Sequence, residues 1–454
     1  MKILFAASEA TPLAKTGGLA DVAGSLPPQL RAAGLDARLI LPAYPGCEEA
    51  LSDVGTAVRL SIPGAPAAVE VVQGRLADTG LPVLLVRAPL LFQREGSLYL
   101  DARGREHWDN ALRFGVFCRA VTAVANGQGP AGWRPDVVHC NDWQTGLVPP
   151  LLAGQPERPA TLFTIHNLAY QGLFDYPTFL NLELPAKLWS SEALEFYDQL
   201  SFIKGGLAFA DRVTTVSPTY AEEICSPALG YGLEGLLQHR REHLSGILNG
   251  IDTTVWDPAR DPLIAANYDA GHLAGKAGNK TALQQAFGLP QRHDVALFGH
   301  IGRLVEQKGT DLIIDVLPTL LQRDDVQLVI LGAGDPALEA ALRSAAARHP
   351  GRLGITLGYD EALAHLIEAG SDSFLMPSRF EPCGLNQLYS LRYGAVPIVH
   401  RTGGLADTVV DASEANCAAD VATGFVFTAP TAQALQVAID RALARYATPG
   451  RWRR

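Results

Sequence analysis

The residues with the clearest chemical potential lie between Ser378 and Gln387, where the sequence reads S-R-F-E-P-C-G-L-N-Q. The apolar run before this stretch predicts a buried strand, and residues 388–394 after it predict a helix that ends at a glycine. Glu381 therefore falls on a strand-to-helix turn. A carboxylate in such a turn can bind the hydroxyls of a ligand or simply cap the helix, and both interpretations stay open here. The amides at the positive end of the predicted helix are those of Cys383, Gly384 and Leu385.

Two cations, Arg303 and Lys308, stand five residues apart at a predicted loop-to-helix junction that follows an apolar strand over residues 295–301. An arginine fork and a lysine point charge together suit a diphosphate. As a leaving diphosphate gains charge, each charge-assisted hydrogen bond contributes about 1.5–3 kcal/mol. The alternative, solvated residues at a helix end, explains each cation alone better than it explains the pair.

In the first half of the chain, Asp142 and His166 each follow a predicted strand. Both side chains can meet a sugar at the carboxyl edge of a parallel sheet. Taken singly, each is better explained as a hydrogen-bonded structural residue. The sequence has no Asp-x-Asp motif and no metal-ligand spacing, so no metal site is predicted.

Short apolar runs alternate along most of the chain with helix-like stretches, one of them near residues 193–210, which predicts an α/β fold with doubly wound parallel sheets. The alternation pauses in a segment rich in Pro, Asp and Gly and then starts again. We therefore expect two Rossmann-like domains, residues 1–245 and 263–454, joined by a linker over residues 246–262.

The hexapeptide T-G-G-L-A-D occurs twice, from Thr16 and from Thr402, each time between a predicted strand and a predicted helix. Either a shared loop geometry or common descent of the two halves explains the repeat. In both cases the sequence predicts glycine-lined helix starts at strand carboxyl ends, where open α/β sheets bind ligands.

Composition limits the class of protein. Of the 454 residues 48% are hydrophobic and 19% are charged, as in folded globular enzymes. The net charge of -10 favours no nucleic-acid partner. The N-terminus lacks a signal-peptide core and no apolar run is long enough to span a membrane, so no membrane partner is expected. Six cysteines without a C-x-x-C pair indicate reduced thiols and a cytoplasmic location.

Five motifs follow one another along nearly the whole chain. They are K-T-G-G-L from Lys15, H-N-L-A-Y-Q-G from His166, N-G-I-D from Asn249, R-x-x-x-Q-K-G from Arg303 and R-F-E-P-C-G-L from Arg379. Together they resemble bacterial glycogen synthases and plant starch synthases. The resemblance implies a retaining glycosyltransferase that uses ADP-glucose, with two Rossmann-like domains facing a deep cleft, the GT-B arrangement.

The resemblance also assigns residues. It places Arg303 and Lys308 on the donor phosphates and Glu381 on the glucose hydroxyls. It also implies that Lys15 and Gly18 approach the donor diphosphate and glucose from the first domain. The implied catalytic set is His166, Arg303, Lys308, Glu381 and Asp142. The implied substrate-binding set is Lys15, Gly18, Tyr99, Asn249, Cys383, Gly384 and Leu385.

The implied reaction moves glucose from ADP-glucose to the non-reducing 4-hydroxyl of an α-1,4-glucan, either glycogen or a malto-oligosaccharide, with retention of configuration. Retention usually calls for a carboxylate nucleophile. Because the resemblance gives Glu381 to sugar binding, we favour front-face substitution, in which the diphosphate oxygen takes the acceptor proton. No cofactor or metal is expected.

Two alternatives stay open. One is a different two-domain glycosyltransferase, or a sugar-nucleotide epimerase, that uses a UDP-sugar; the T-G-G-L loop near Lys15 disfavours it. The other is a glucan-binding homologue with impaired catalysis. The four residues Lys15, Arg303, Lys308 and Glu381 disfavour that reading.

Two positions depart from the wider pattern of retaining transferases. Many of them carry a second glutamate eight residues after the first, where this chain has Tyr389, as the glycogen synthase branch does. The family also usually continues into a helix that returns to the first domain. Because the sequence stops at Arg454, we expect either that it is truncated or that the protein lacks this return helix.

Overall fold

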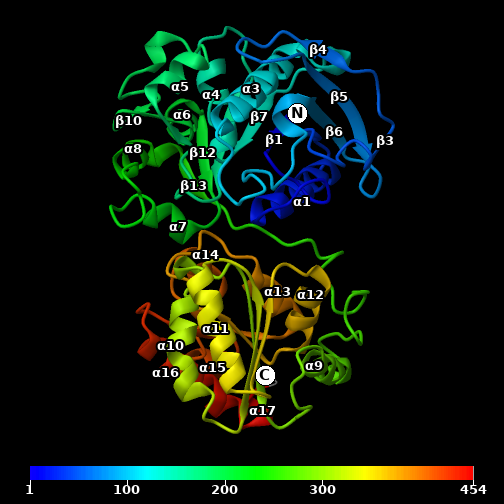
Figure 1. The fold of residues 1–454 in the computed structure, drawn as a ribbon, viewed down its shortest axis with the longest axis vertical. Helices are drawn as coiled ribbons and strands as arrows, with labels where there is room; N and C mark the ends of the chain where they lie inside the picture. Colours follow the sequence, from blue (N-terminus) through cyan, green and yellow to red (C-terminus); the bar gives the residue numbers. More distant parts are fainter. Residues whose placement is uncertain (453–454) are drawn as a thin grey trace. The chain divides into compact units, whose positions relative to one another are not determined.

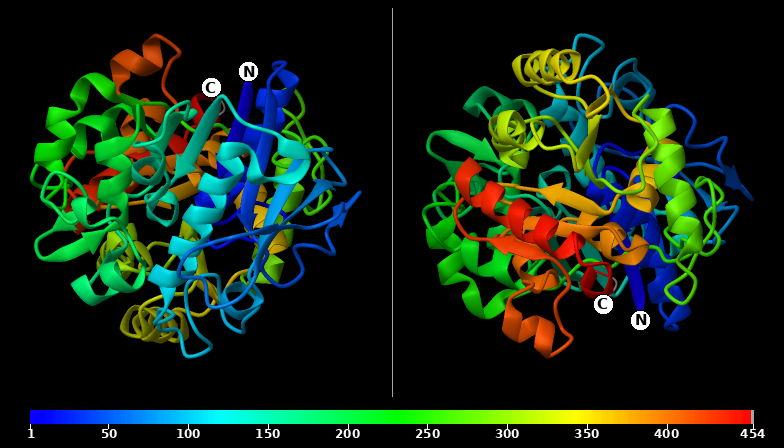
Figure 2. Two further views of the ribbon diagram at one scale, coloured as in Figure 1. Left: turned by 90° about the horizontal axis from the view of Figure 1, so that it is seen from above. Right: turned by 90° about the horizontal axis from the view of Figure 1, so that it is seen from below.

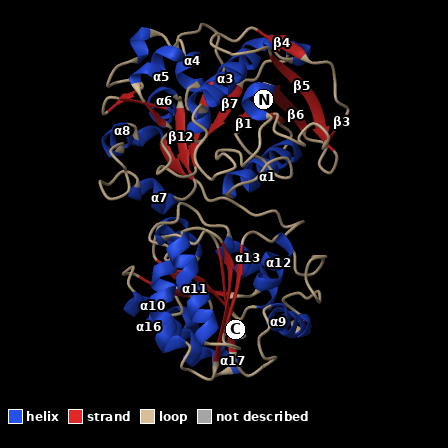
Figure 3. Ribbon diagram, viewed as in Figure 1, coloured by secondary structure: helices blue, strands red, loops and turns tan. Residues whose placement is uncertain are grey.

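The computed structural model describes residues 1–452, so Arg453 and Arg454 at the basic end of the chain lie outside the described residues. The chain divides into two compact units, unit 1 over residues 1–249 and unit 2 from residue 250 onward. Each unit is an α/β domain with its own parallel sheet (Figures 1 and 3). The predicted fold class is therefore confirmed.

The main sheet of unit 1 is parallel over most of its width. Its parallel strands are, in spatial order, β13 (Leu244–Gly246), β12 (Arg212–Thr215), β8 (Ala160–Ile165), β7 (Val137–Asn141), β1 (Lys2–Ala6), β2 (Asp36–Pro42) and β6 (Pro82–Arg87). An antiparallel extension, which the sequence did not reveal, continues through β5 (Val69–Leu76) to β3 (Leu51–Ser52), with β4 (Val58–Leu60) also paired to β5. The parallel strands are short and largely buried, as strands covered on both faces must be.

The helices of unit 1 are α1 (Gly18–Ala32), α2 (Pro89–Phe92), α3 (Asn110–Ala123), α4 (Val148–Leu152), α5 (Tyr176–Asn181), α6 (Phe202–Phe209), α7 (Pro218–Glu223) and α8 (Glu234–His239). The helix expected near 193–210 is only partly correct. Its first half forms β10 (Glu195–Phe196) and β11 (Gln199–Ser201), which pair with β9 (Leu173–Phe174) in a small antiparallel sheet. Positive φ angles of 49° at Tyr197 and 62° at Asp198 turn the chain there, and a helix cannot contain that turn.

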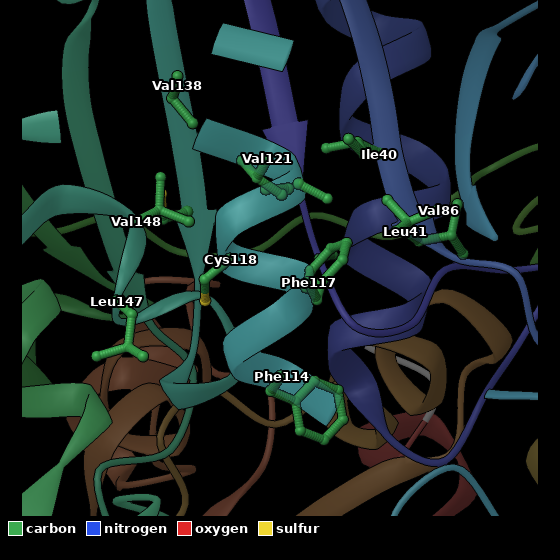
Figure 4. Packing of buried hydrophobic residues seen from close by; sticks show 14 of the residues in the cluster. Ile40, Leu41, Val86, Phe114, Phe117, Cys118, Val121, Val138, Leu147 and Val148 are labelled. Atoms are coloured by element: carbon green, nitrogen blue, oxygen red, sulfur yellow. The ribbon is translucent and has the colours of Figure 1, made fainter. Parts of the chain in front are cut away.

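Helix α3 is the central core element of unit 1 (Figure 4). Its side chains Phe117 and Val121 are fully buried and lie among residues of β2 and β7, including Ile40 and Val138. The Cys118 thiol also donates to the carbonyl of Gln144 at 3.2 Å. Packing of α3 therefore fixes the segment that follows β7, where Asp142 lies.

Unit 2 has one all-parallel sheet. Its strands are, in spatial order, β16 (Leu353–Leu357), β15 (Val326–Gly332), β14 (Ala296–Ile301), β17 (Ser373–Met376), β18 (Val396–His400) and β19 (Phe425–Phe427). Its helices are α9 (Ala274–Ala286), α10 (Thr310–Leu320), α11 (Pro336–Arg348), α12 (Glu361–Gly370), α13 (Asn386–Tyr393), α14 (Gly403–Thr408), α15 (Glu414–Ala418), α16 (Ala432–Tyr446) and α17 (Pro449–Trp452).

The helices of unit 2 cover both faces of its sheet (Figure 1). Helices α10, α11 and α16 pack together on one face, and α9, α12 and α13 pack together on the other. Figure 2 shows α16, in red, lying against β18 and β19. Within residues 1–452, none of the helices combines the length and the apolar character that crossing a membrane requires.

The boundary between the units differs from the expected linker over residues 246–262. Gly246 ends a strand of unit 1, and the units divide after Asn249. The Trp256 ring lies flat between His365 and Tyr389, with centroid distances of 3.9 and 3.7 Å. Residues 250–262 are therefore a packed segment of unit 2, and their Pro, Asp and Gly residues shape its turns instead of keeping it free.

Replacing Trp256 with alanine should lower the free energy of unfolding of unit 2 by about 3–5 kcal/mol, because a buried indole and two ring stacks are lost. Guanidinium chloride unfolding of the whole chain, followed by circular dichroism, measures the change. The neighbouring variant Val255→Ala is the control, since Val255 is 48% exposed. Equal, small effects of both changes would show that Trp256 does not hold this segment on unit 2.

Candidate functional site

Glu381 lies just beyond the carboxyl end of β17 and is only 6% exposed. One of its carboxylate oxygens accepts hydrogen bonds from the Lys308 ammonium at 2.6 Å and from the Ser378 hydroxyl at 2.9 Å. Helix α13 begins at Asn386 and has no side-chain cap. The helix-cap interpretation of Glu381 is therefore wrong, and the carboxylate forms an ion pair instead.

A glycine brings Lys308 to this carboxylate. Lys308 ends a short 3-10 turn after β14, and Gly309 follows with a φ of 70°. A Cβ at Gly309 would lie 2.1 Å from the carbonyl oxygen of Pro377, so only glycine allows the loop to approach β17 this closely. The close approach sets the 2.6 Å ion pair between groups 73 residues apart.

Arg303 lies on the exposed loop between β14 and Lys308. Its guanidinium donates to the Gln307 side chain at 3.0 Å, and the Gln307 backbone carbonyl accepts from the amide of Arg379 at 2.8 Å. Arg379 in turn forms a two-pronged ion pair with Asp311 of α10 at 2.7 and 2.6 Å. Hydrogen bonds thus connect the loop that carries both predicted phosphate-binding cations to the Glu381 turn.

The side chain of Gln387 holds the turn that follows Glu381. The Gln387 amide donates to the carbonyls of Cys383 and Gly384, both at 3.0 Å, and Gly384 has a φ of 74°. Cys383 is buried, whereas Gly384 and Leu385 are half-buried. The predicted substrate-binding residues Cys383, Gly384 and Leu385 therefore form one rigid turn at the start of α13.

The two copies of T-G-G-L-A-D have different structural roles. In the second copy, a Cβ at Gly403 or Gly404 would lie 2.0 or 2.1 Å from the carbonyl oxygens of Glu381 and Cys383. In the first copy, a Cβ at Gly17 would meet nothing within 4 Å. The second copy therefore packs against the Glu381 turn, whereas the space beside Gly17 in the first copy is open.

In unit 1, Asp142 and His166 are brought into direct contact. The Asp142 carboxylate accepts from the His166 backbone amide at 2.7 Å, and the His166 ring pairs with the Asn141 side-chain oxygen at 2.9 Å. The Asn141 amide nitrogen donates to the Ala6 carbonyl at 3.0 Å, which orients its oxygen towards His166. His166 Nε2 therefore carries the proton and Nδ1 is the acceptor nitrogen.

Burial shifts both titrating groups of this pair. Burial, with a smaller contribution from His139, lowers the pKa of His166 to about 3, so the imidazole stays neutral. Burial raises the pKa of Asp142 to about 7, opposed by the hydrogen bonds from the amides of His166 and Asn167. Asp142 also has a φ of 57°, an uncommon backbone conformation for a non-glycine residue and typical of functional sites.

The loop of the first T-G-G-L copy is exposed from Lys15 to Gly18. The Lys15 ammonium pairs with Asp21 of α1 at 2.9 Å. Tyr99 does not point freely to solvent: its hydroxyl bonds Ser8 at 2.7 Å and Glu9 at 3.1 Å. Asn249 is half-buried and is the last residue of unit 1.

The sequence did not reveal several residues that hold these groups. They are Ser378 and Gln307 in unit 2, and Asn141 and Glu9 in unit 1. Asn141 and Ser378 lie at the ends of the two predicted strands that precede Asp142 and Glu381. Their positions in the sequence could therefore have indicated that they belong to the site. Glu9 lies six residues before the K-T-G-G-L loop, and nothing in its local sequence distinguishes it from a surface acid.

Unit 1 has an aromatic hollow of about 580 Å³, and its lining includes residues that closely follow Asp142 and His166 in the sequence. It is lined by Trp143, residues 169–174, residues of the β10–β11 hairpin and Tyr231. Three of the lining residues, Tyr170, Tyr197 and Tyr231, are 49%, 75% and 39% exposed. The hollow therefore offers flat apolar faces edged by polar groups.

Comparison with known proteins places both units in characterised families. Residues 2–239 match the family described as starch synthase catalytic domain, and residues 282–454 match glycosyl transferases group 1. Glycogen synthase 2 of Nitrosococcus oceani is 55% identical over 453 residues, covering 100% of this chain and 92% of that protein. Glycogen synthase 1 of Methylococcus capsulatus is 56% identical, covering 100% and 91%.

A solved structure is also similar to this chain. The catalytic domain of starch synthase IV from Arabidopsis thaliana, bound to ADP and acarbose, matches with a TM-score of 0.90 and 33% identity. The match covers 100% of this chain and 93% of that one. With sequence, fold and motifs in agreement, the chain belongs to the glycogen and starch synthase family of retaining glycosyltransferases with the GT-B fold.

Proposed function

We propose that the protein transfers glucose from ADP-glucose to the non-reducing 4-hydroxyl of an α-1,4-glucan with retention of configuration. The observation that carries the proposal is the Lys308–Glu381 pair at the carboxyl edge of the unit 2 sheet, beside the Arg303 loop. This edge is where open α/β sheets bind their ligands. The donor class also fits the starch synthase IV structure, which holds ADP.

Unit 2 supplies charge to the donor. Arg303, on an exposed loop, reaches a diphosphate with a planar fork, and Lys308 adds a point charge. As the glycosidic bond breaks, the diphosphate gains negative charge, which these fixed cations stabilise without reorganising. We therefore assign stabilisation of the leaving-group charge to these two cations.

Glu381 acts as a hydroxyl acceptor in this proposal. One carboxylate oxygen is occupied by Lys308 and Ser378, which lowers its nucleophilicity and holds the group in one orientation. The carboxylate then accepts hydrogen bonds from glucose hydroxyls, and the departing diphosphate oxygen takes the proton of the acceptor hydroxyl. Front-face substitution of this kind retains configuration without a glycosyl-enzyme bond.

Unit 1 supplies neutral polar groups and the acceptor surface. Neutral His166 presents Nδ1 as a hydrogen-bond acceptor for a sugar hydroxyl. We assign the glucan to the aromatic hollow, because tyrosine and tryptophan faces pack against the apolar faces of sugar rings while their edges bond hydroxyls. We also propose a cytosolic location, since all six cysteines are free and five are buried.

Label transfer to glycogen tests the function. With radiolabelled ADP-glucose and UDP-glucose in parallel, we expect transfer from ADP-glucose to exceed transfer from UDP-glucose. Preference for UDP-glucose would instead support the rival transferase. Glycogen binding without transfer from either donor would support a non-catalytic glucan-binding protein.

Arg303→Ala should lower kcat by about 10²- to 10³-fold, because it removes a preorganised cation from the leaving group. Steady-state kinetics with ADP-glucose measures the loss. Arg343→Ala is the matched control: Arg343 is 65% exposed and makes only a 3.7 Å ion pair with Glu339 in the same unit. A rise in KM at unchanged kcat would assign Arg303 to ground-state binding only.

Asp142→Asn should remove a pH dependence of stability. Because the folded-state pKa of about 7 exceeds the ordinary value, folded Asp142 keeps a proton that the unfolded chain releases. The contribution of Asp142 to the free energy of unfolding is complete below about pH 4. It falls as the pH rises through 7, by at most about 1.4 kcal/mol per pH unit.

Urea unfolding at pH 5, 6, 7 and 8 measures this slope, and the wild-type protein should lose stability relative to Asp142→Asn over that range. The control is Asp198→Asn, at an exposed aspartate that shares the positive φ. Parallel curves for the wild type and Asp142→Asn would contradict the assignment.

A further inference from the structure

Glu9 is a buried acid of unit 1 that has no part in the mechanism above. It lies three residues after the end of β1 and is only 4% exposed. Its Oε2 atom accepts three hydrogen bonds from the glycine loop: from the Thr16 amide at 2.6 Å, the Thr16 hydroxyl at 2.9 Å and the Gly17 amide at 3.1 Å. One carboxylate oxygen thus binds both backbone amides that lead into α1.

The other carboxylate oxygen of Glu9 is occupied from a distant segment. The Tyr99 hydroxyl donates to Glu9 Oε1 at 3.1 Å and accepts from the Ser8 hydroxyl at 2.7 Å. Burial, with the negative charge of Glu9, raises the pKa of Tyr99, so the phenol remains a donor. Tyr99 therefore holds the Glu9 carboxylate, and the carboxylate holds the loop.

Besides Glu9, the loop is held by the Lys15–Asp21 ion pair at 2.9 Å and by the hydrogen bond from the Ala20 amide to the Gly17 carbonyl at 3.2 Å, both made to α1. Residues 15–18 are exposed, and the space around Gly17 is open. The second T-G-G-L-A-D copy is fixed differently, because its glycines pack directly on the backbone of Glu381 and Cys383. Glycine-rich segments lose much conformational entropy when they become ordered, so an open glycine loop needs a tether.

We propose that Glu9 is a positioning residue that holds the loop from Lys15 to Gly18 in the conformation that receives the donor diphosphate. Tyr99 acts through Glu9 and not by contact with the sugar, which revises its role from substrate binding to positioning. The proposal rests on the proposed function, since the loop is assigned to the donor through that function. A carboxylate suits the task because its hydrogen bonds to backbone amides are charge-assisted.

Hydrogen exchange of the whole protein without substrate tests the tether. Glu9→Ala should raise the exchange rates of the Thr16 and Gly17 amides by about tenfold or more, since both lose a charge-assisted acceptor. Glu9→Gln keeps a neutral acceptor of the same shape, so its exchange rates at Thr16 and Gly17 should fall between those of the wild type and those of Glu9→Ala. Glu49→Ala, at an exposed glutamate of the same unit, is the control and should leave these amides unchanged.

A double-mutant cycle on kcat/KM for ADP-glucose separates positioning from contact. Glu9→Ala should lower kcat/KM by about 10²-fold, the effect of a misplaced binding group. Tyr99→Phe should lower it less. The double variant Glu9→Ala, Tyr99→Phe should be no worse than Glu9→Ala alone, because Tyr99 acts only through Glu9.

Unchanged exchange at Thr16 and Gly17 in Glu9→Ala would overturn the proposal, and so would additive kinetic effects of the two changes. Additive effects would return Tyr99 to direct contact with the substrate. If the wild-type protein transfers no glucose, the proposed function fails, and the exchange measurement still decides whether Glu9 tethers the loop.

Discussion

The structure of the unit 2 site depends on one ion pair, between Lys308 and Glu381. The two side chains are 22% and 8% exposed, so each charge would be costly without the other. This constraint accounts for the features around it: glycine at position 309 lets the loop reach β17, and Gly403 and Gly404 let a second loop close over the Glu381 turn. Substituting any of these glycines would separate or expose the pair.

The same ion pair determines the chemistry that we propose. A carboxylate that shares one oxygen with an ammonium and a hydroxyl is held rigidly and is a weak nucleophile. It is well suited to accept hydroxyl hydrogens from a sugar. Unit 1 is organised on a different principle, with a neutral histidine, an aspartate of raised pKa and a carboxylate that binds amides. The two cations that we assign to the leaving diphosphate, Arg303 and Lys308, both lie in unit 2.

The sequence predicted those parts of the fold whose signal is local. Buried runs such as Phe374–Met376 indicate parallel strands by themselves, and glycine turns indicate where helices begin. The turn at Tyr197 and Asp198 carries no glycine or proline, so a strand pair was mistaken for a helix. Trp256 sits in a segment with linker-like composition, and only tertiary packing shows that it belongs to unit 2.

The site was predictable to a similar degree. Motif residues such as Glu381 and Lys308 could be named, but their pairing joins positions 73 residues apart and depends on how the strands are arranged. Glu9 was missed for the same reason: its partners lie across a loop, and its role is set by hydrogen bonds alone. Local patterns thus indicate which residues matter, and packing decides what each one does.

The most direct test of the central claim is whether Glu381 ever forms a bond to glucose. The protein is incubated with ADP-2-deoxy-2-fluoroglucose, whose fluorine slows the breakdown of any glycosyl-enzyme. Competitive inhibition first shows that the analogue binds, and mass spectrometry of the intact protein and its peptides follows. Our account predicts an unchanged protein mass, and a fluoroglucosyl adduct on the peptide that contains Glu381 would contradict it.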